Sequence, residues 1–240
     1  MMNVVIGFVL AALIAGVAYA RQSLSRSGAF TAVVIGTIIY ATGGAFMMSV
    51  LLTFFVSSNV IGRLFTIKKE PAKRTAKQVL ANGLVAILMA VMFYTTKDEL
   101  FSILFVTSIA VATADTWSSE LGVLSKTSPI SLVTFKPTKY GVSGSVTWVG
   151  LFASFAGAVL ISSFVMFNVW IMIFGFLGSI LDSLLGHFQV RYLDSTSGAV
   201  IEDQEKNSSD KYHSGIRYLT NDGVNFISNA VTVLVAYLIL

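Results

Sequence analysis

The chain has 240 residues, of which 55% are hydrophobic and only 12% are charged. A soluble domain usually has about a quarter of its residues charged, and a single soluble core could not bury this much apolar surface. Lipid accepts apolar side chains around every helix, so the composition indicates a membrane protein. The absence of cysteine excludes disulfides and thiolate metal sites, and His187 and His213 are too few for a zinc site. The net charge of +4 is modest. We interpret the positive residues as a signal of membrane topology and expect no nucleic acid as partner.

Eight apolar segments follow one another along the chain, most of them close to the ~20 residues that a spanning helix needs. They cover residues 4–20, 30–42, 45–61, 79–94, 100–114, 146–167, 169–188 and 224–240. No Pro- or Ser-rich linker and no internal repeat suggests a second domain. The predicted fold class is therefore all-α, a polytopic integral membrane helical bundle of about seven to eight transmembrane segments, with one membrane-embedded domain over residues 1–240.

The stretch over residues 30–61 is too long for one ordinary span. Gly43 and Gly44 divide it near its middle, so we expect a tight helical hairpin there. If one tilted helix crossed the membrane instead, the basic loops 21–27 and 62–78 would lie on opposite sides.

The first apolar segment, Met1–Ala20, has no positive charge before it, and Arg21 and Arg26 follow it. This order of charges differs from that of a secretory signal peptide. It favours an uncleaved first helix with its N-terminus outside.

The basic residues support this orientation. Of the 16 Lys and Arg residues, all but Lys97 then fall in the inner loops, which are 21–27, 62–78, 115–145 and 189–223. The positive-inside rule therefore predicts eight spans, both termini outside and the long loops in the cytoplasm, in the plasma membrane if the organism is prokaryotic. The middle of loop 189–223 is polar and mixed in charge, and we expect a solvated, mobile loop there.

Asp182 lies within an apolar run that is otherwise fit to span the membrane. An unpaired carboxylate there costs roughly 2.5 kcal/mol or more. Gly175, Gly178, Ser179 and Gly186 recur around it at three- and four-residue steps, as a stripe of small residues on one helix face. The stripe fits close helix packing around a satisfied acid. It also fits an acid that faces a polar cavity or a metal, which is the interpretation we favour.

Asp115 follows a run of small residues that resembles a helix end, and Glu120 comes a little more than one turn later. Two carboxylates beside hydroxyl groups at a membrane rim suit a hard cation such as Mg²⁺, which prefers oxygen ligands. The alternative is a helix cap and a surface acid. A third polar cluster, Asn221, Asp222 and Asn225, begins the last apolar segment, where Asp222 suits the positive helix end and Asn225 needs a partner.

Arg74, Gln78 and Asn82 are spaced four residues apart, so they share one helix face that enters the membrane. Such a face can hold a phosphate by charge-assisted hydrogen bonds. The alternative is a positive anchor against anionic lipid, which explains the basic residues better than the two amides.

The segment over residues 136–145 joins two lysines, Lys136 and Lys139, to a Gly/Ser turn that contains Ser143 and Gly144. Backbone N–H groups of such a turn before a helix can bind phosphate. The turn lacks the Lys-Ser/Thr ending of a Walker A motif, and turns of this kind precede many helices. On the predicted topology all these groups share the cytoplasmic side, which suggests a pocket for a phosphorylated ligand and a divalent cation.

Five motifs together resemble the transmembrane protein 19 family, also called domain of unknown function 92. The matching segments are Phe54–Ser58, Arg74–Gly83, Ala114–Gly122, Gly178–Gly186 with Gln189 following, and Thr220–Asn225. Their order and spacing match over nearly the whole chain. One departure is Ser145, which stands where the family pattern has a second glycine, and it speaks against the turn before it as a phosphate cradle.

The resemblance implies an integral membrane protein. The plant chloroplast member is a phytyl-phosphate kinase, and nucleotide-dependent polyprenol kinases are more distantly similar. We therefore expect a Mg²⁺-dependent prenyl-phosphate kinase-like enzyme, which transfers a phosphoryl group from a nucleoside triphosphate, CTP or ATP, to a prenyl-phosphate lipid. The prenyl monophosphate would be phytyl or geranylgeranyl, and the product is the diphosphate.

On this hypothesis the acids are catalytic and bind the metal, and the other polar residues bind substrate and phosphate. The acids are Asp115, Glu120, Asp182 and Asp222. The binding residues are Arg74, Gln78, Asn82, Lys136, Lys139, Ser143, Gly144, Asn221 and Asn225. The alternative is a transporter or flippase of a small or phosphorylated substrate, since acids within a membrane also mark ion pathways. A scaffold without chemistry would leave Asp182 and Asn225 unexplained.

Overall fold

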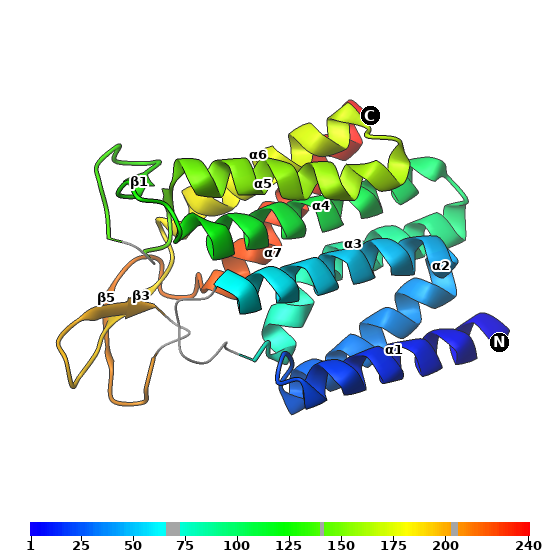
Figure 1. The fold of residues 1–240 in the computed structure, drawn as a ribbon, viewed down its shortest axis with the longest axis horizontal. Coiled ribbons are helices and arrows are strands. Elements are labelled where there is room, and N and C mark those ends of the chain that lie inside the picture. The colour runs from blue at the N-terminus through cyan, green and yellow to red at the C-terminus, as the bar shows by residue number, and fades with distance from the viewer. Residues whose placement is uncertain (66–72, 140–141, 203–205) are drawn as a thin grey trace.

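The computed structural model describes residues 1–65, 73–139, 142–202 and 206–240. These residues contain seven helices that are long and apolar enough to cross a membrane, which confirms the predicted polytopic helical bundle. The helices are α1 (Met2–Ala20), α2 (Arg26–Phe65), α3 (Ala76–Thr96), α4 (Glu99–Gly122), α5 (Trp148–Ser162), α6 (Val169–Gly186) and α7 (Asn221–Ile239), and the 3-10 helix η1 (Ser163–Val165) continues α5. All seven run roughly along the long axis of the molecule (Figure 1).

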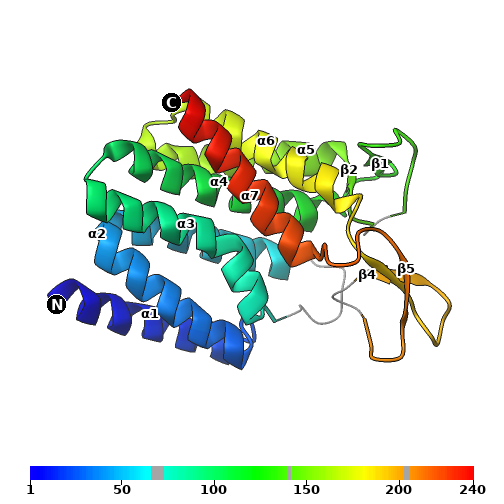
Figure 2. The same ribbon diagram turned by 180° about the vertical axis from the view of Figure 1, so that it is seen from behind.

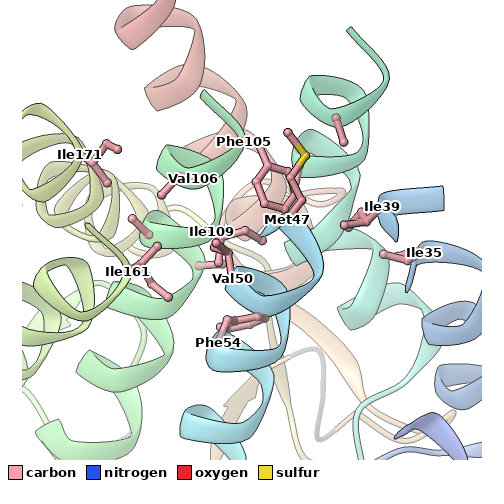
Figure 3. Packing of buried hydrophobic residues seen from close by; sticks show 14 residues of the cluster. Ile35, Ile39, Met47, Val50, Phe54, Phe105, Val106, Ile109, Ile161 and Ile171 are labelled. Carbon is pink, nitrogen blue, oxygen red and sulfur yellow. The ribbon is translucent and has the colours of Figure 1, made fainter. Parts of the chain in front are cut away.

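Helix α2 is a hairpin of two helical arms that fold back on each other at Gly44. This residue has φ 63° and ψ −155°, which lies outside the helical region. In a straight helix Ile35 and Phe54 would be about 28 Å apart at 1.5 Å per residue. Both belong instead to one cluster of buried side chains, and Ile39 and Met47 lie on neighbouring ribbons in Figure 3. The predicted hairpin is therefore confirmed.

The two chain termini lie at the same end of the bundle, and the strands lie at the opposite end (Figures 1 and 2). With α2 counted as two arms the chain traverses the bundle an even number of times, as this arrangement requires. The described residues of the four connections predicted to be inner loops lie at the end that carries the strands, which we call the loop end.

Helix α4 is the centre of the bundle. Every residue from Leu104 to Ala114 is buried, which is typical of a helix that other helices surround on all sides. Phe105 and Ile109 belong to the main hydrophobic cluster, which also contains Met47 of α2 and Ile171 of α6 (Figure 3). The outer helices expose large apolar side chains instead, as lipid-facing helices do.

Two small antiparallel sheets lie at the loop end. Strand β1 (Ile130–Ser131) pairs with β2 (Ser145–Val146), and β3 (Arg191–Leu193) lies between β4 (Val200–Glu202) and β5 (Lys211–Ser214). The strands of the second sheet lie on both sides of the middle of loop 189–223, and that middle contains no strand among its described residues. Residues 203–205, in the middle of that loop, lie outside the described residues.

The turn between β3 and β4 explains why a polar segment is ordered here. The Asp194 carboxylate accepts hydrogen bonds from the backbone N–H groups of Thr196 and Ser197, both at 2.7 Å. Gly198 follows with φ 67°, a conformation that favours glycine. The two N–H groups stabilise the ionised acid, and they lower the pKa of Asp194 from its ordinary value. Strands are usually recognised in a sequence by alternating apolar residues. Here local side-chain hydrogen bonds order the turn between the strands, so the sequence lacks that pattern.

We expect Gly44→Ala to destabilise the protein by about 1–3 kcal/mol, because φ 63° with ψ −155° is almost confined to glycine. A methyl group at Gly44 would meet no atom within 4 Å, so the loss reports backbone strain and not a clash. Gly16→Ala in α1 is the matched control, since its methyl group also meets open space. That change should be neutral or stabilising by up to about 1 kcal/mol. Equal thermal unfolding midpoints of the two variants in detergent would contradict the hairpin geometry.

Candidate functional site

Two acids from different helices meet inside the bundle. The carboxyl groups of Asp115 in α4 and Asp182 in α6 are in hydrogen-bonding contact. Two donors from α7 hold the second acid: Ser228 Oγ donates to Asp182 Oδ2 at 2.8 Å. In the amide orientation of Asn225 that matches donors with acceptors, its nitrogen donates to the same oxygen and to the Asn221 carbonyl, both at 3.1 Å. We call Asp115 and Asp182 the acid pair.

The small-residue stripe of α6 explains how the acid pair forms. A Cβ atom added at Gly178 would lie 2.6 Å from the side chain of Val111, and one added at Gly175 would lie 3.0 Å from that of Ala110. The glycines therefore let α6 approach α4 closely. Asp182, one turn after Gly178, comes to face α4 as a result.

The acid pair lies inside the loop end of the bundle and not at its surface. At 1.5 Å per residue, Asp182 is about 6 Å from the last residue of α6 and Asp115 is about 10 Å from the last residue of α4. The position of Asp115 corrects our expectation of a helix end there, because α4 continues to Gly122. Two carboxylates in contact repel each other unless a proton or a cation lies between them. The pair therefore has the character of a site for a proton or a metal.

Arg74 is held at the loop end by its backbone. Its N–H donates to the Ser23 carbonyl and its carbonyl accepts from Ser25, both at 3.0 Å. Gly28 makes room for it, since a Cβ atom there would lie 2.2 Å from the Arg74 carbonyl oxygen. The half-buried guanidinium group lies 5.6 Å from the centre of the Phe54 ring. Burial lowers the pKa of Arg74, and the charge of Glu120 opposes that change.

Glu120 connects α4 to this arginine and to the second arm of α2. Its carboxyl group lies 3.4 Å from the position that a Cβ atom of Gly62 would take. One turn earlier, Trp117 Nε1 donates to Ser57 Oγ of the same arm at 3.3 Å. Because Glu120 is five residues after Asp115, the arginine side of the site is about 7.5 Å from the acid pair along the axis of α4.

Arg74, Gln78 and Asn82 line one pocket between α1, the two arms of α2 and α3, whose empty space is about 720 Å³ when the open space at its mouth is included. Within the described residues, all other side chains of the lining are apolar. Gln78 Oε1 accepts from the Thr75 N–H at 2.9 Å in the capping box of α3, and Asn82 Nδ2 donates to the Gln78 carbonyl at 3.0 Å. The polar face of α3 is thus directed into an otherwise apolar cavity.

The Gly/Ser turn before α5 packs against the end of α6. A Cβ atom at Gly144, which has φ 87°, would lie 2.6 Å from the Cα of His187. The Ser143 N–H donates to Glu202 Oε1 at 2.8 Å, and Arg191 Nη2 donates to the Ser143 carbonyl at 3.2 Å. A carboxylate thus accepts a hydrogen bond from the N–H group that we expected to bind phosphate, and Gly144 is packed against the end of α6.

Lys136 and Lys139 are exposed on the β1–β2 connection. Neither has a hydrogen bond to the acid pair in the part of the chain that the structure describes. At the start of α7, Thr220 is the helix cap, because its Oγ1 accepts from the Gly223 N–H at 3.2 Å. Asp222 is half-buried in the first turn of α7.

The described residues contain no group of three or more acids and histidines that could hold a metal ion. The structure therefore does not join the four expected acids into one cluster: Asp115 and Asp182 meet, Glu120 lies near Arg74, and Asp222 stands on α7. Mg²⁺ in proteins is often bound by one or two carboxylates together with waters and substrate phosphates. The acid pair fits that ligand set.

Ser228 and Ser57 belong to the site, although the sequence did not single them out. Ser228 contacts Asp182, and Ser57 fastens Trp117 of α4. A signal for Ser228 existed, because Asn225 and Ser228 are polar residues three apart in an apolar helix and therefore share a face. Ser57 lies in the Phe54–Ser58 segment that matches the family pattern, but nothing in that segment indicated a partner on α4.

Comparison with known proteins gives one family and several relatives. A family model described as integral membrane protein DUF92 matches residues 9–233. Protein PGR of Arabidopsis thaliana is 29% identical, over 96% of the chain and 93% of its own length. Uncharacterised membrane proteins of Methanocaldococcus jannaschii and Synechocystis sp. are 32% and 27% identical, over 91% and 87% of the chain and 86% and 79% of their own lengths. No solved structure gives a significant match.

If a cation binds between the acids, MgCl₂ should raise the unfolding midpoint of the purified protein relative to EDTA. A ligand at a hundred times its Kd stabilises by about 2.7 kcal/mol. Asp115→Asn should abolish this gain, and in EDTA it should be at least as stable as the wild type because the repulsion between the acids is gone. Glu99→Gln, at the other end of the same helix, is the control and should keep the gain. An unchanged wild-type midpoint would show that a proton and not Mg²⁺ occupies the pair.

Proposed function

The chain belongs to the DUF92 family of integral membrane proteins, and from this premise we propose that it is a membrane prenyl-phosphate kinase. It transfers the terminal phosphoryl group of a nucleoside triphosphate to a prenyl monophosphate, phytyl or geranylgeranyl, and so makes the diphosphate. The observation that supports this proposal most directly is the contact between Asp115 and Asp182, two carboxylates inside a lipid-facing bundle at the end where Arg74 also lies.

The proposed reaction needs charge neutralisation and alignment more than acid or base catalysis. A phosphate monoester has its second pKa near about 6, so the attacking oxygen is already ionised at neutral pH. That oxygen forms a bond to the terminal phosphorus of the donor, the bond from this phosphorus to the bridging oxygen breaks, and the nucleoside diphosphate leaves. Phosphoryl transfer of this kind depends mainly on positioning and on stabilisation of charge.

Each group has a role in this scheme that follows from its place. The acid pair would hold Mg²⁺, which would supply positive charge to neutralise phosphate oxygens. Ser228 and Asn225 fix the orientation of Asp182. Arg74 binds the prenyl phosphate through charge-assisted hydrogen bonds. Glu120 is a positioning residue for that arginine.

The donor, CTP or ATP, would approach from the loop end. The positive-inside rule supports a cytoplasmic position for this end, because it carries the basic loops, and the cytoplasm is the side that holds nucleotides. Lys136 and Lys139 are exposed there, where they can attract the phosphates of the donor before it binds.

We expect purified protein to convert geranylgeranyl or phytyl monophosphate to the diphosphate with a nucleoside triphosphate and Mg²⁺. Asp182→Asn and Arg74→Ala should each lower turnover by about a hundredfold or more, because the first weakens binding of the Mg²⁺ that would neutralise the phosphates and the second removes the charge that binds the prenyl phosphate. Glu99→Gln should leave turnover unchanged.

The same preparation distinguishes the alternative. Flux of a phosphorylated substrate into liposomes without chemical change would identify a transporter. No turnover with either lipid under any nucleotide and Mg²⁺ condition, together with unchanged lipid profiles in cells that carry Asp182→Asn, would rule out the kinase.

A further inference from the structure

We call the pocket that Arg74, Gln78 and Asn82 line the slot; it lies between four helical segments. Its walls come from α1, the two arms of α2 and α3, and apart from the polar face of α3 its described lining consists of aliphatic, aromatic, alanine and glycine residues. A cavity of this composition accepts a hydrocarbon chain.

The slot extends from the loop end toward the middle of the membrane. Gly36 is ten residues from the start of α2, and Ala11 is nine residues from the end of α1, so both lie about 14–15 Å deep at 1.5 Å per residue. These two residues close the slot, since a Cβ atom at Gly36 would lie 2.8 Å from that of Ala11 and 3.5 Å from the end of Met48. The depth is about half of the ~30 Å hydrocarbon core.

The polar end of the slot is suited to one anionic group. The half-buried Arg74 guanidinium supplies the charge. Gln78 uses its Oε1 in the capping box, and its Nε2 has no hydrogen-bond partner among the described residues, so one amide donor remains for a ligand. A guanidinium and an amide donor at the mouth of an apolar slot match a phosphate ester.

We propose that this slot binds the chain of a single-chain isoprenoid phosphate, with its phosphate at Arg74, and that Ala32 and Met48 determine how long a chain is accepted. The proposal rests on the proposed function for the identity of the lipid. Ala32 lies six residues into α2, about 9 Å deep, and a larger side chain there fills the slot midway. Met48 lies at the closed end, where a smaller side chain extends the slot.

Equilibrium binding of radiolabelled geranyl, farnesyl and geranylgeranyl monophosphate to the full chain in nanodiscs, without nucleotide, tests this. Ala32→Phe should weaken geranylgeranyl binding by about tenfold or more, since two excluded methylene groups already correspond to about that factor, and should change geranyl binding by less than about threefold. Met48→Ala should shift the preference toward the longest chain. Because the two variants should act in opposite directions, unfolding cannot imitate the result.

Val34→Phe is the matched control. Val34 lies on the same arm of α2 as Ala32, but it is 43% exposed and does not line the slot. The chain-length preference of the Val34→Phe variant should therefore equal that of the wild type. Arg74→Ala should weaken binding of all three lipids by the same factor, because they share the phosphate.

Three outcomes would overturn the proposal. One is a loss in Ala32→Phe that is equal for all chain lengths. The others are competition by phosphatidic acid as strong as that by geranylgeranyl monophosphate, which would indicate a two-chain lipid, and displacement by inorganic phosphate alone, which would indicate a phosphate site without a chain site. Length-selective binding in a protein that shows no phosphoryl transfer would support the slot and refute the kinase. If the protein transfers phosphoryl groups but Ala32→Phe and Met48→Ala leave its chain-length preference unchanged, the kinase is supported and the slot is refuted.

Discussion

Close packing of α6 on α4 is the contact on which the interior chemistry depends. Gly178 has no side chain, and a methyl group there would lie 2.6 Å from Val111, so only glycine lets the helices approach this far. The approach brings Asp182 into contact with Asp115. An acid in a membrane must find its partners within the protein, because lipid offers none. This requirement explains why α7 carries the hydroxyl of Ser228 and the amide of Asn225 at the same level.

A second contact decides where the positive charge lies. Arg74 belongs to no helix, and its place comes from two backbone hydrogen bonds to the turn between α1 and α2 and from the space that Gly28 leaves. The hairpin at Gly44 then returns the second arm of α2 to the loop end, where Phe54 lies under the guanidinium group. The arginine is thus placed at the mouth of an apolar pocket, close to Glu120 of α4.

The packing of α6 on α4 and the placement of Arg74 together create two different environments at the loop end of the bundle. The arginine side opens into an apolar pocket that the first three helices form, and the acid side lies among α4, α6 and α7. Helix α4 joins them, since it carries both Asp115 and Glu120. An amphiphilic phosphate can place its chain in one part and its charge near the other. This division explains why a membrane helix bundle and a site for a charged group occur in the same small chain.

The sequence by itself determined the spans, the hairpin and the end of the bundle at which the polar groups gather. These follow from hydropathy, from glycine and from charge, which act residue by residue between lipid and water. It also suggested that Asp182 needs a partner. Only the tertiary structure decided which partner, because helices far apart in the chain meet according to their rotation and distance of approach. For the same reason the extent of α4 beyond Asp115, the bond of Ser143 to Glu202 and the three-stranded sheet could not be predicted. Each depends on contacts with segments that the local sequence does not specify.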